Sequence, residues 1–342
     1  MAKVITMGEL LLRLSPPGNI RFFEATDLQV HYGGAEANVA ASLAQLGHDV
    51  TFLTKLPVNP IGDAAIGSLR KVGINCTHIA RGGERLGIYF LENGASIRPS
   101  SVIYDRKYSS ITMANPEDFD FDAIFQNVDL FHVSGITPCL SDSAYMLTIA
   151  ALKSAKSHNV TVSFDLNYRA KLWTENIQQK QERMADMMQY VDICFGNARD
   201  AAKCLGYSEP NMDFINGDYA VCIEERHMHN VLHTYQFQYL VTTLRDSISA
   251  SDNGWSGVVC NTTSQYKGKN YHLHIVDRVG GGDAFASGFL HGLLSGMKME
   301  MALEFALAAA AIKHTIPGDF NYLSESEVLT LMNSDGSGRV QR

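Results

Sequence analysis

The chain of 342 residues is long enough to bury a large core, either as one α/β domain or as a domain with an insertion. Its hydrophobic share of 46% is ordinary for a globular protein. A formal net charge of −8, with no block of basic residues, argues against nucleic acid and an anionic membrane surface as partners.

Cysteine usage and hydropathy indicate a reducing compartment. The six cysteines are widely spaced and include no Cys-x-x-Cys pair, which favours neither a disulfide framework nor a zinc site. The first residues lead directly into a strand-like run without the apolar core of a signal peptide, and no apolar run reaches ~18 residues. We therefore expect a cytoplasmic protein without a membrane segment.

The N-terminal part begins with a strand and a helix. Residues 3–14 have a strand-like apolar pattern, and the segment 15–19 is a strong turn signal. Residues 20–32 mix aromatic, aliphatic and polar side chains in a way that favours exposed-face strands. After Gly33 and Gly34, residues 35–47 predict a helix whose small residues allow close packing.

The next part changes from an α/β rhythm to β-rich sequence. A short strand over 49–54 and a helix ending near Gly73 continue the rhythm, whereas residues 87–91 and 101–106 indicate hairpin strands. We expect the β-rich pieces at about 12–34 and 84–112 to form one small sheet inserted into the α/β body. It is either a lid over the active site, an edge used for dimer contacts, or both.

From residue 129 onward the alternation becomes regular. Strands are predicted over 130–135, 160–165, 191–196 and 239–243, with a helix over 141–158. This rhythm predicts a parallel sheet covered on both faces, in which ligands lie beyond the carboxyl ends of the strands. The rule selects residues that follow strands: Asn167, Arg169, Asn197, Asp200 and Arg245. No linker or repeat divides the chain, so we expect a single domain over 1–342 with a loose tail at 333–342.

A glycine-rich stretch at 276–285, Val-Asp-Arg-Val-Gly-Gly-Gly-Asp-Ala-Phe, predicts an anion site. Gly280, Gly281 and Gly282 permit a tight turn, and the apolar run at 284–294 predicts a helix packed on a sheet. The N-terminus of such a helix offers unpaired N–H groups and the positive end of its dipole, which suit a phosphate. Asp283 then either caps the helix or serves as a general base beside the phosphate.

The stretch from Asp277 to Asp283 resembles the C-terminal signature, Asp-Thr-x-Gly-Ala-Gly-Asp, of the ribokinase-type or phosphofructokinase-B sugar kinases. Gly33-Gly34-Ala35-Glu36-Ala37-Asn38 resembles the N-terminal signature of that family, in the expected order. The resemblance implies a ribokinase-like three-layer α/β/α sandwich with a mainly parallel sheet and a β-lid. Arg278 and the third glycine make the keto-deoxygluconate kinase branch the most similar part of the family.

The same branch implies a set of substrate-binding residues. The implied residues are two glycines that allow close approach to the sugar (Gly33 and Gly34), a hydrogen-bonding amide (Asn38), two tyrosines (Tyr89 and Tyr104), two carboxylate-binding arginines (Arg106 and Arg169) and two pocket residues (Ile136 and Asp319). Neutral sugars would not require two such arginines. An arginine at either position is otherwise an ordinary solvated side chain.

The nucleotide side follows from the same resemblance. Asn197-Ala198-Arg199-Asp200 resembles the Asn-x-x-Glu motif that positions Mg²⁺ and phosphate, with Asp200 one methylene shorter; the alternative for this pair is a helix cap. Thr243, Arg245 and Ser247 match the nucleotide loop, so that Asn197, these residues, Gly280 and Gly282 are expected to contact ATP.

Two features have no assigned chemistry. The histidines His227, His229 and His233 lack an acid or cysteine that would complete a metal site, so a solvated helix is expected. Arg278 replaces the threonine of the general family signature, and the sequence suggests no physical role for it.

The expected activity is ATP-dependent phosphorylation of the C6 hydroxyl of 2-keto-3-deoxygluconate, with Asp283 as base and the glycines stabilising the phosphoryl charge. The alternatives are a related kinase for fructose, ribose or another neutral sugar, a non-catalytic sugar sensor on the same fold, and a dinucleotide-dependent dehydrogenase. A dinucleotide-dependent dehydrogenase would carry Gly-x-Gly-x-x-Gly after its first strand, and this sequence does not. A homo-oligomer formed through the β-lid is expected.

Overall fold

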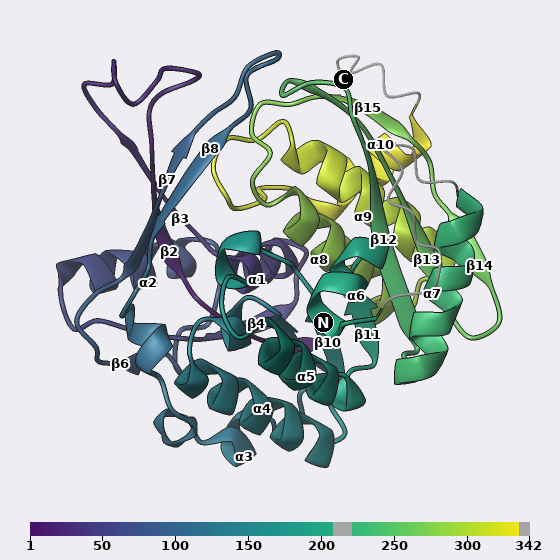
Figure 1. The fold of residues 1–342 in the computed structure, drawn as a ribbon, viewed down its shortest axis with the longest axis horizontal. Coiled ribbons are helices and arrows are strands. Elements are labelled where there is room, and N and C mark those ends of the chain that lie inside the picture. The colour runs from purple at the N-terminus through teal and green to yellow at the C-terminus, as the bar shows by residue number, and fades with distance from the viewer. Residues whose placement is uncertain (208–220, 335–342) are drawn as a thin grey trace.

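A computed structural model describes residues 1–207 and 221–334 of the chain. Within these residues the centre is a nine-stranded sheet in the order β14-β13-β12-β11-β10-β9-β1-β4, and β15 also pairs with β13 (Figure 1). The parallel part consists of β1 (Lys3–Met7), β4 (Asp49–Leu53), β9 (Leu130–Ser134), β10 (Thr161–Asp165), β11 (Ile193–Phe195) and the first residues of β12 (Tyr239–Ser247).

The remaining strands of this sheet run antiparallel and were not predicted. They are β13 (Asp252–Cys260), β14 (Gln265–Lys267) and β15 (Tyr271–His274). Strand β12 continues to Ser247, beyond its predicted end at residue 243, because its second half pairs with β13. The mainly parallel sheet predicted from the sequence is therefore confirmed, with an antiparallel edge added.

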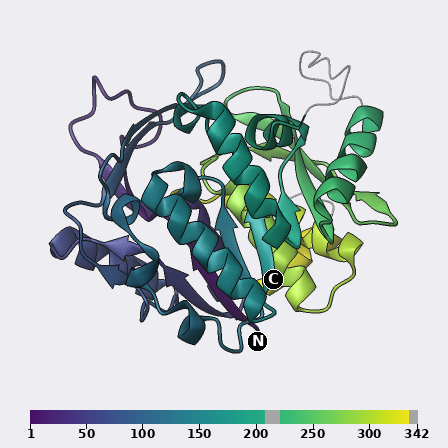
Figure 2. The same cartoon turned by 60° about the horizontal axis from the view of Figure 1, so that its bottom comes forward.

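Helices cover both faces of the sheet (Figures 1 and 2). One apolar cluster joins the strands to α4 (Asp142–Ser157), α5 (Ile177–Met187) and α7 (Val221–Tyr235). The second cluster joins them to α1 (Ala35–Gln45), α2 (Pro60–Lys71), α8 (Gly281–Leu294) and α9 (Met299–Lys313). The shorter helices are α3 (Phe121–Ile124), α6 (Ala198–Leu205) and α10 (Glu325–Asn333). The three-layer α/β/α arrangement expected from the sequence is confirmed.

In the described part of the chain, four further strands form a small sheet that stands out from the body (Figure 1). Their order is β3-β2-β7-β8, and their bounds are Gln29–Gly33, Leu11–Ser15, Gly87–Glu92 and Ser101–Asp105. The two β-rich pieces predicted from the sequence thus join in one sheet. The short strands β5 (Lys55–Leu56) and β6 (Ala80–Arg81) pair separately.

Two boundaries differ from the sequence prediction. The strand-like stretch 3–14 forms two strands in different sheets, because the chain leaves the body after Met7 and enters the small sheet at Leu11. Of the segment 20–32, only residues from Gln29 onward form a strand. The predicted loose tail lies, from residue 335 onward, outside the described residues.

Candidate active site

The glycine-rich turn leads into helix α8 at the carboxyl side of the parallel strands. Gly280 has a φ of 81°, a left-handed conformation that disfavours any side chain. A Cβ atom on Gly280 would also lie 2.5 Å from the backbone oxygen of Asp319. Because the first N–H groups of a helix have no partner within it, the wall formed by Gly280, Gly281 and Gly282 suits an anion.

Asp283 lies in the first turn of α8 and is half-buried. Its Oδ2 accepts a hydrogen bond of 2.6 Å from Nδ2 of Asn38 on α1, and Oδ1 of Asn38 accepts one of 3.3 Å from the Gly34 N–H. The two glycine signatures therefore meet at one carboxylate. Burial raises the pKa of Asp283 to about 6, although the Asn38 hydrogen bond and the charge of Arg169 oppose this shift.

A cavity of about 440 Å³ opens over this carboxylate, between the small sheet and the strand ends. Besides Asp283 and the three glycines, it is lined by residues predicted for sugar or nucleotide binding: Gly34, Asn38, Tyr89, Tyr104, Arg106, Ile136, Arg169, Asp200, Arg245 and Asp319. Gly33 lies directly behind the wall, because a Cβ atom there would collide with the Asp319 carboxylate. The cavity has the size of a site for a small organic ligand.

A smaller cavity of about 70 Å³ adjoins the first and shares Asp165, Asp200 and Gly282 with it. Asn197 and Thr243, both predicted to contact the nucleotide, line this second cavity. Ser247 lies at the exposed end of β12, opposite Asn253, and lines neither of these two cavities.

The two arginines predicted to bind a carboxylate differ in their surroundings. The Arg106 guanidinium is already paired with Glu9: its Nε donates to Glu9 Oε2 at 2.8 Å, and Nη2 contacts the same oxygen. It also lies 5.1 Å from the centre of the Tyr104 ring. Arg169 is exposed at the cavity, and the hydrogen bond of its side chain is to the neighbouring carbonyl of Tyr168. Arg169 is therefore the arginine better able to receive a ligand carboxylate.

Asp200 has the alternative role considered for it, that of a helix cap. The Asn197 side chain accepts from the Asp200 N–H at 2.9 Å, and Asp200 Oδ2 accepts from the Asn197 N–H at 3.3 Å, which forms a capping box at the start of α6. Its carboxylate still lines both cavities. Burial raises the pKa of Asp200.

Asp165, at the end of β10, was not selected from the sequence. Burial and the nearby charge of Asp283 raise the pKa of Asp165 to about 8, with a smaller effect from Asp200. Three carboxylates near one cavity thus repel one another. Asp165 is the last residue of a predicted strand. The rule that ligands lie beyond the carboxyl ends of parallel strands selected only the residues that follow it.

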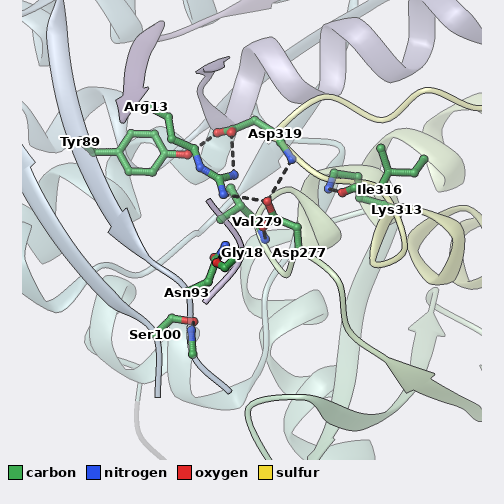
Figure 3. Close-up of polar contacts among 12 residues, drawn as sticks. Arg13, Gly18, Tyr89, Asn93, Ser100, Asp277, Val279, Lys313, Ile316 and Asp319 are labelled. Atoms are coloured by element: carbon green, nitrogen blue, oxygen red, sulfur yellow. Dashed lines mark hydrogen bonds and ion pairs between the residues drawn. The ribbon is translucent and has the colours of Figure 1, made fainter. Parts of the chain in front are cut away.

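A buried ion-pair network lies behind the part of the cavity wall that Tyr89 and Asp319 form (Figure 3). Arg13 on β2 is 1% exposed and bonds to Asp277 at 2.7 Å and to Asp319 at 3.0 Å. Although burial alone lowers it, the two carboxylates raise the pKa of Arg13 above its usual range. The Tyr89 hydroxyl donates to Asp319. Sequence reasoning had not selected Arg13 or Asp277 as site residues.

Arg278 contacts the turn between β12 and β13. Its Nη2 donates to the carbonyl oxygens of Ser249 at 3.3 Å and of Ala250 at 3.1 Å. The Ala250 N–H in turn donates to the Ser96 carbonyl, in the loop between β7 and β8, at 2.7 Å. Arg278 therefore connects the glycine turn to the β12–β13 turn, which contacts the small sheet.

The histidines lie away from this cavity. His229 and His233 stack on α7 with ring centres 6.4 Å apart, and the His227 side chain lies outside the described part. In the described ranges, no group of three or more His, Cys, Asp or Glu side chains is arranged to hold a metal ion. The helices in those ranges include none that is both long and apolar enough to cross a membrane.

Known proteins resemble this chain over almost its full length. The curated 2-dehydro-3-deoxygalactonokinase of Haloferax volcanii is 32% identical over 337 residues, which cover 98% of each chain. The crystal structure of 2-dehydro-3-deoxygluconokinase from Thermotoga maritima has a TM-score of 0.91 and 47% identity, and the match covers 97% of this chain and 98% of that one.

A third similarity concerns the fold alone. The crystal structure of fructokinase with bound ATP from Xylella fastidiosa has a TM-score of 0.78 at 21% identity, with 98% of this chain and 99% of that chain covered. The family model described as pfkB family carbohydrate kinase matches residues 1–324. Together with the two glycine signatures that meet at Asp283, these matches show that the chain belongs to the pfkB family of carbohydrate kinases.

Proposed function

We propose that the protein is an ATP-dependent kinase that phosphorylates the C6 hydroxyl of 2-keto-3-deoxygluconate. The observation that supports this most is a single cavity that contains Asp283 beside the glycine turn and Arg169 at its opening. An acid such as this one offers a hydroxyl at one end and a carboxylate at the other, which matches a base at one side and a guanidinium at the other. The names of the similar proteins from Haloferax and Thermotoga agree with this substrate class.

Asp283 acts as the general base in the proposed reaction. The C6 oxygen forms a bond to the γ-phosphorus of ATP as the bond from that phosphorus to the β,γ-bridging oxygen breaks, and the hydroxyl proton moves to Asp283. The hydrogen bond from Asn38 fixes the carboxylate in one orientation. The N–H groups at the start of α8 stabilise the negative charge on the phosphoryl oxygens, a contribution of about 3 kcal/mol for one such donor.

ATP occupies the side of the cavity nearest β11 and β12. Asn197 and Thr243 line the smaller cavity there, and Arg245 lines the larger one beside the glycine turn. The Arg245 guanidinium lies 5.4 Å from the centre of the Trp255 ring, which holds its side chain in place. We assign the phosphates to the space between Arg245 and the three glycines.

Mg²⁺ fits the carboxylates shared by the two cavities. Asp165 and Asp200 offer hard oxygen ligands. Burial and the charge of Asp283 raise the pKa of Asp165, so a cation placed there would favour its ionised form. These two side chains would hold the ion directly or through water. When bound, Mg²⁺ neutralises phosphate charge on ATP.

2-Keto-3-deoxygalactonate is the second candidate substrate. The Haloferax protein carries the name of the galactono compound, whereas the Thermotoga structure carries the name of the glucono compound. The two acids share the carboxylate and the terminal hydroxyl, so Asp283 and Arg169 serve both equally. Discrimination must come from other residues of the wall.

Release of ADP with a panel of sugars tests the proposal. The panel contains both keto-deoxy acids, fructose, ribose and a no-sugar control, and the phosphorylated carbon is identified by NMR. We expect kcat/KM for a keto-deoxy acid to exceed that for fructose or ribose by about 10–100-fold, the discrimination given by a hydrogen bond to a charged group. A higher kcat/KM for a neutral sugar, or no ADP release with any sugar, would reject the proposed substrate.

We further propose that the whole chain is one kinase domain that forms a homo-oligomer through its small sheet, which serves as a lid. The register of this sheet places Val30, Leu14, Phe90 and Ile103 side by side across all four strands. Val30 is 57% exposed and Ile103 is 54% exposed. An exposed apolar row of this kind is typical of a surface that another protein covers. Phe23 and Ile97, in the segments that connect these strands, are also exposed.

A further inference from the structure

Arg13 is the charged residue of the small sheet that is most completely enclosed by protein. It lies on the inner face of β2, and its cross-strand partners are His31 on β3 and Tyr89 on β7. The side chain is 2% exposed, so the guanidinium has lost its hydration. A buried charge of this kind is stable only when paired with opposite charges.

Two carboxylates from the kinase body supply that pairing (Figure 3). Nη2 bonds to Asp277 Oδ2 at 2.7 Å, and Nη1 bonds to Asp319 Oδ2 at 3.0 Å. Asp277 is held further by the N–H groups of Val279 at 3.1 Å and of Gly318 at 3.0 Å. One guanidinium thus joins a lid strand to the beginning of the glycine turn and to the loop that contains Asp319.

The network continues to groups at both ends of the cavity. Asp319 accepts the hydroxyl of Tyr89, and both side chains line the sugar side. Gly280 lies against the other side of the network, because a Cβ atom there would be 3.2 Å from Lys313 Cε. Lys313 is also fully buried and donates to the Ile316 carbonyl at 3.0 Å. Arg13 forms the ion pairs with Asp277 and Asp319, and Lys313 is a second buried basic residue close enough to feel the charge of both.

We propose that Arg13 is a positioning residue for phosphoryl transfer, which aligns the sugar side of the cavity with the glycine turn. Arg13 contacts neither ATP nor the sugar. Its bond to Asp319 orients that side chain and Tyr89, and its bond to Asp277 fixes the N–H group of Val279. The part that concerns the sugar depends on the proposed function. One consequence is that β2 moves together with the glycine turn, so opening of the lid occurs in the segments farther from the body.

The test compares Arg13→Met and Arg13→Lys with wild type, and uses Arg98→Met as the matched control. Arg98 lies in the loop between β7 and β8 and, like Arg13, pairs with a carboxylate, Glu92, at 3.0 Å. Its other side-chain bond is to the Asn19 carbonyl and not to the glycine turn. Three quantities are measured: hydrogen–deuterium exchange of the peptide 277–285, kcat and KM with the sugar that wild type phosphorylates fastest, and rescue by methylguanidine.

In Arg13→Met we expect faster exchange in the peptide 277–285 and a kcat about 100-fold lower, as for misalignment of reacting groups by about 1 Å. The KM for ATP should stay within about threefold of wild type, and methylguanidine should raise kcat by at least about tenfold. Arg98→Met should match wild type. A purely structural role predicts instead that the folded fraction retains normal kcat and is insensitive to methylguanidine.

Arg13→Lys decides the matter if the methionine variant does not fold. Lysine keeps the charge, but one ammonium cannot reproduce the two directed bonds of the guanidinium fork. A folded Arg13→Lys enzyme with wild-type exchange, kcat and KM would overturn the proposal. The exchange measurement needs no sugar, so it decides the role of Arg13 whichever substrate the enzyme uses. A wild-type enzyme that prefers a neutral sugar would contradict the proposed substrate and leave this test valid.

Discussion

Asp283 combines two properties that a general base requires. Its carboxylate is held by Asn38 at 2.6 Å beside the start of α8, and burial raises its pKa to about 6. A pKa just below neutral lets the group be ionised at physiological pH and still accept a proton effectively. A capping carboxylate would not need the pairing with Asn38, which comes from a distant helix.

The first prediction concerns pH. Because the base must be ionised, kcat/KM should be constant above about pH 7 and should fall tenfold per pH unit below about 6, as the raised pKa of Asp283 requires. Asp283→Asn preserves the contact with Asn38 and should lower kcat about 10²–10⁴-fold while binding of ATP and sugar persists. Steady-state kinetics with calorimetric binding measures both. Near-normal turnover in Asp283→Asn would contradict the assignment.

The second prediction concerns recognition of the acid group. Arg169→Ala removes an exposed guanidinium that has no carboxylate partner among the described residues, so the fold should be unaffected. Loss of a charged hydrogen bond should raise the KM for a keto-deoxy acid about 10–100-fold and change the KM for a neutral sugar much less. The control Arg183→Ala removes a distant surface pair with Asp142. Equal effects on acidic and neutral sugars would contradict the role of Arg169.

The site residues that could be predicted from the sequence occur in recognisable local patterns. Three glycines before an aspartate, and polar residues after apolar strands, indicate function without any knowledge of contacts. Arg13 gives no such signal, because its partners Asp319 and Asp277 lie 306 and 264 residues away. Pairing between Arg106 and Glu9 was equally invisible in the sequence, since 97 residues separate them.

At the scale of elements, α8 carries the proposed base and is positioned by its contact with α9. The contact is close because glycine faces alanine: a Cβ atom on Gly288 would lie 2.7 Å from Ala306 Cα, and one on Gly292 would lie 2.8 Å from Ala302 Cα. The apolar run predicted the helix, and its small residues permit this spacing. The position of Asp283 thus depends on residues one to three turns further along α8.

Gly288→Ala tests this packing. The added methyl group should force the two helices apart and destabilise the fold by about 1–3 kcal/mol, despite the better helix propensity of alanine. Gly67→Ala on α2 is the matched control, because a Cβ atom there meets no atom within 4 Å. That variant should be neutral or up to about 1 kcal/mol more stable. Thermal and urea unfolding measure both changes. Equal stability of the two variants would show that α8 and α9 can adjust freely.

The parallel elements were predictable and the antiparallel edge was not. Strands β9, β10 and β11 are short and apolar with polar residues beyond, a pattern typical of buried parallel strands. Strand β13 contains Asn253, Gly254 and Gly257, residues that disfavour strands when considered alone. Its eight paired positions with β12 override that local preference, and tertiary pairing cannot be read from composition.

At the scale of the whole molecule, the two faces of the small sheet differ in character. Its inner face contributes Tyr89, Tyr104 and the enclosed Arg13 to the kinase body, as the cavity and Figure 3 indicate. Its outer face has the apolar row that includes Leu14 and Ile103. Strands that were predicted only as β-rich pieces therefore have a definite orientation in the folded protein. Alternation of side chains along each strand produces this division.

We predict that the outer face mediates self-association. Ile103→Glu should convert an oligomer into monomers, because a charged side chain cannot be buried unpaired in an apolar interface. Met146→Glu on α4 is the control, since Met146 and Ile103 have the same exposure of 54%. Light scattering coupled to size-exclusion chromatography gives the mass of each. A monomeric wild type, or an unchanged mass in Ile103→Glu, would rule out this interface.

The alternation in β2 also determines where this gene can tolerate changes in length. Leu14 and Arg13 are adjacent in sequence but belong to opposite sides of one sheet, so shifting the strand by a single position would exchange them. Deleting one codon from the three-residue stretch 8–10 would bury a leucine between two aspartates and expose the arginine. The longer connection at 16–28 can absorb the same deletion without moving either strand.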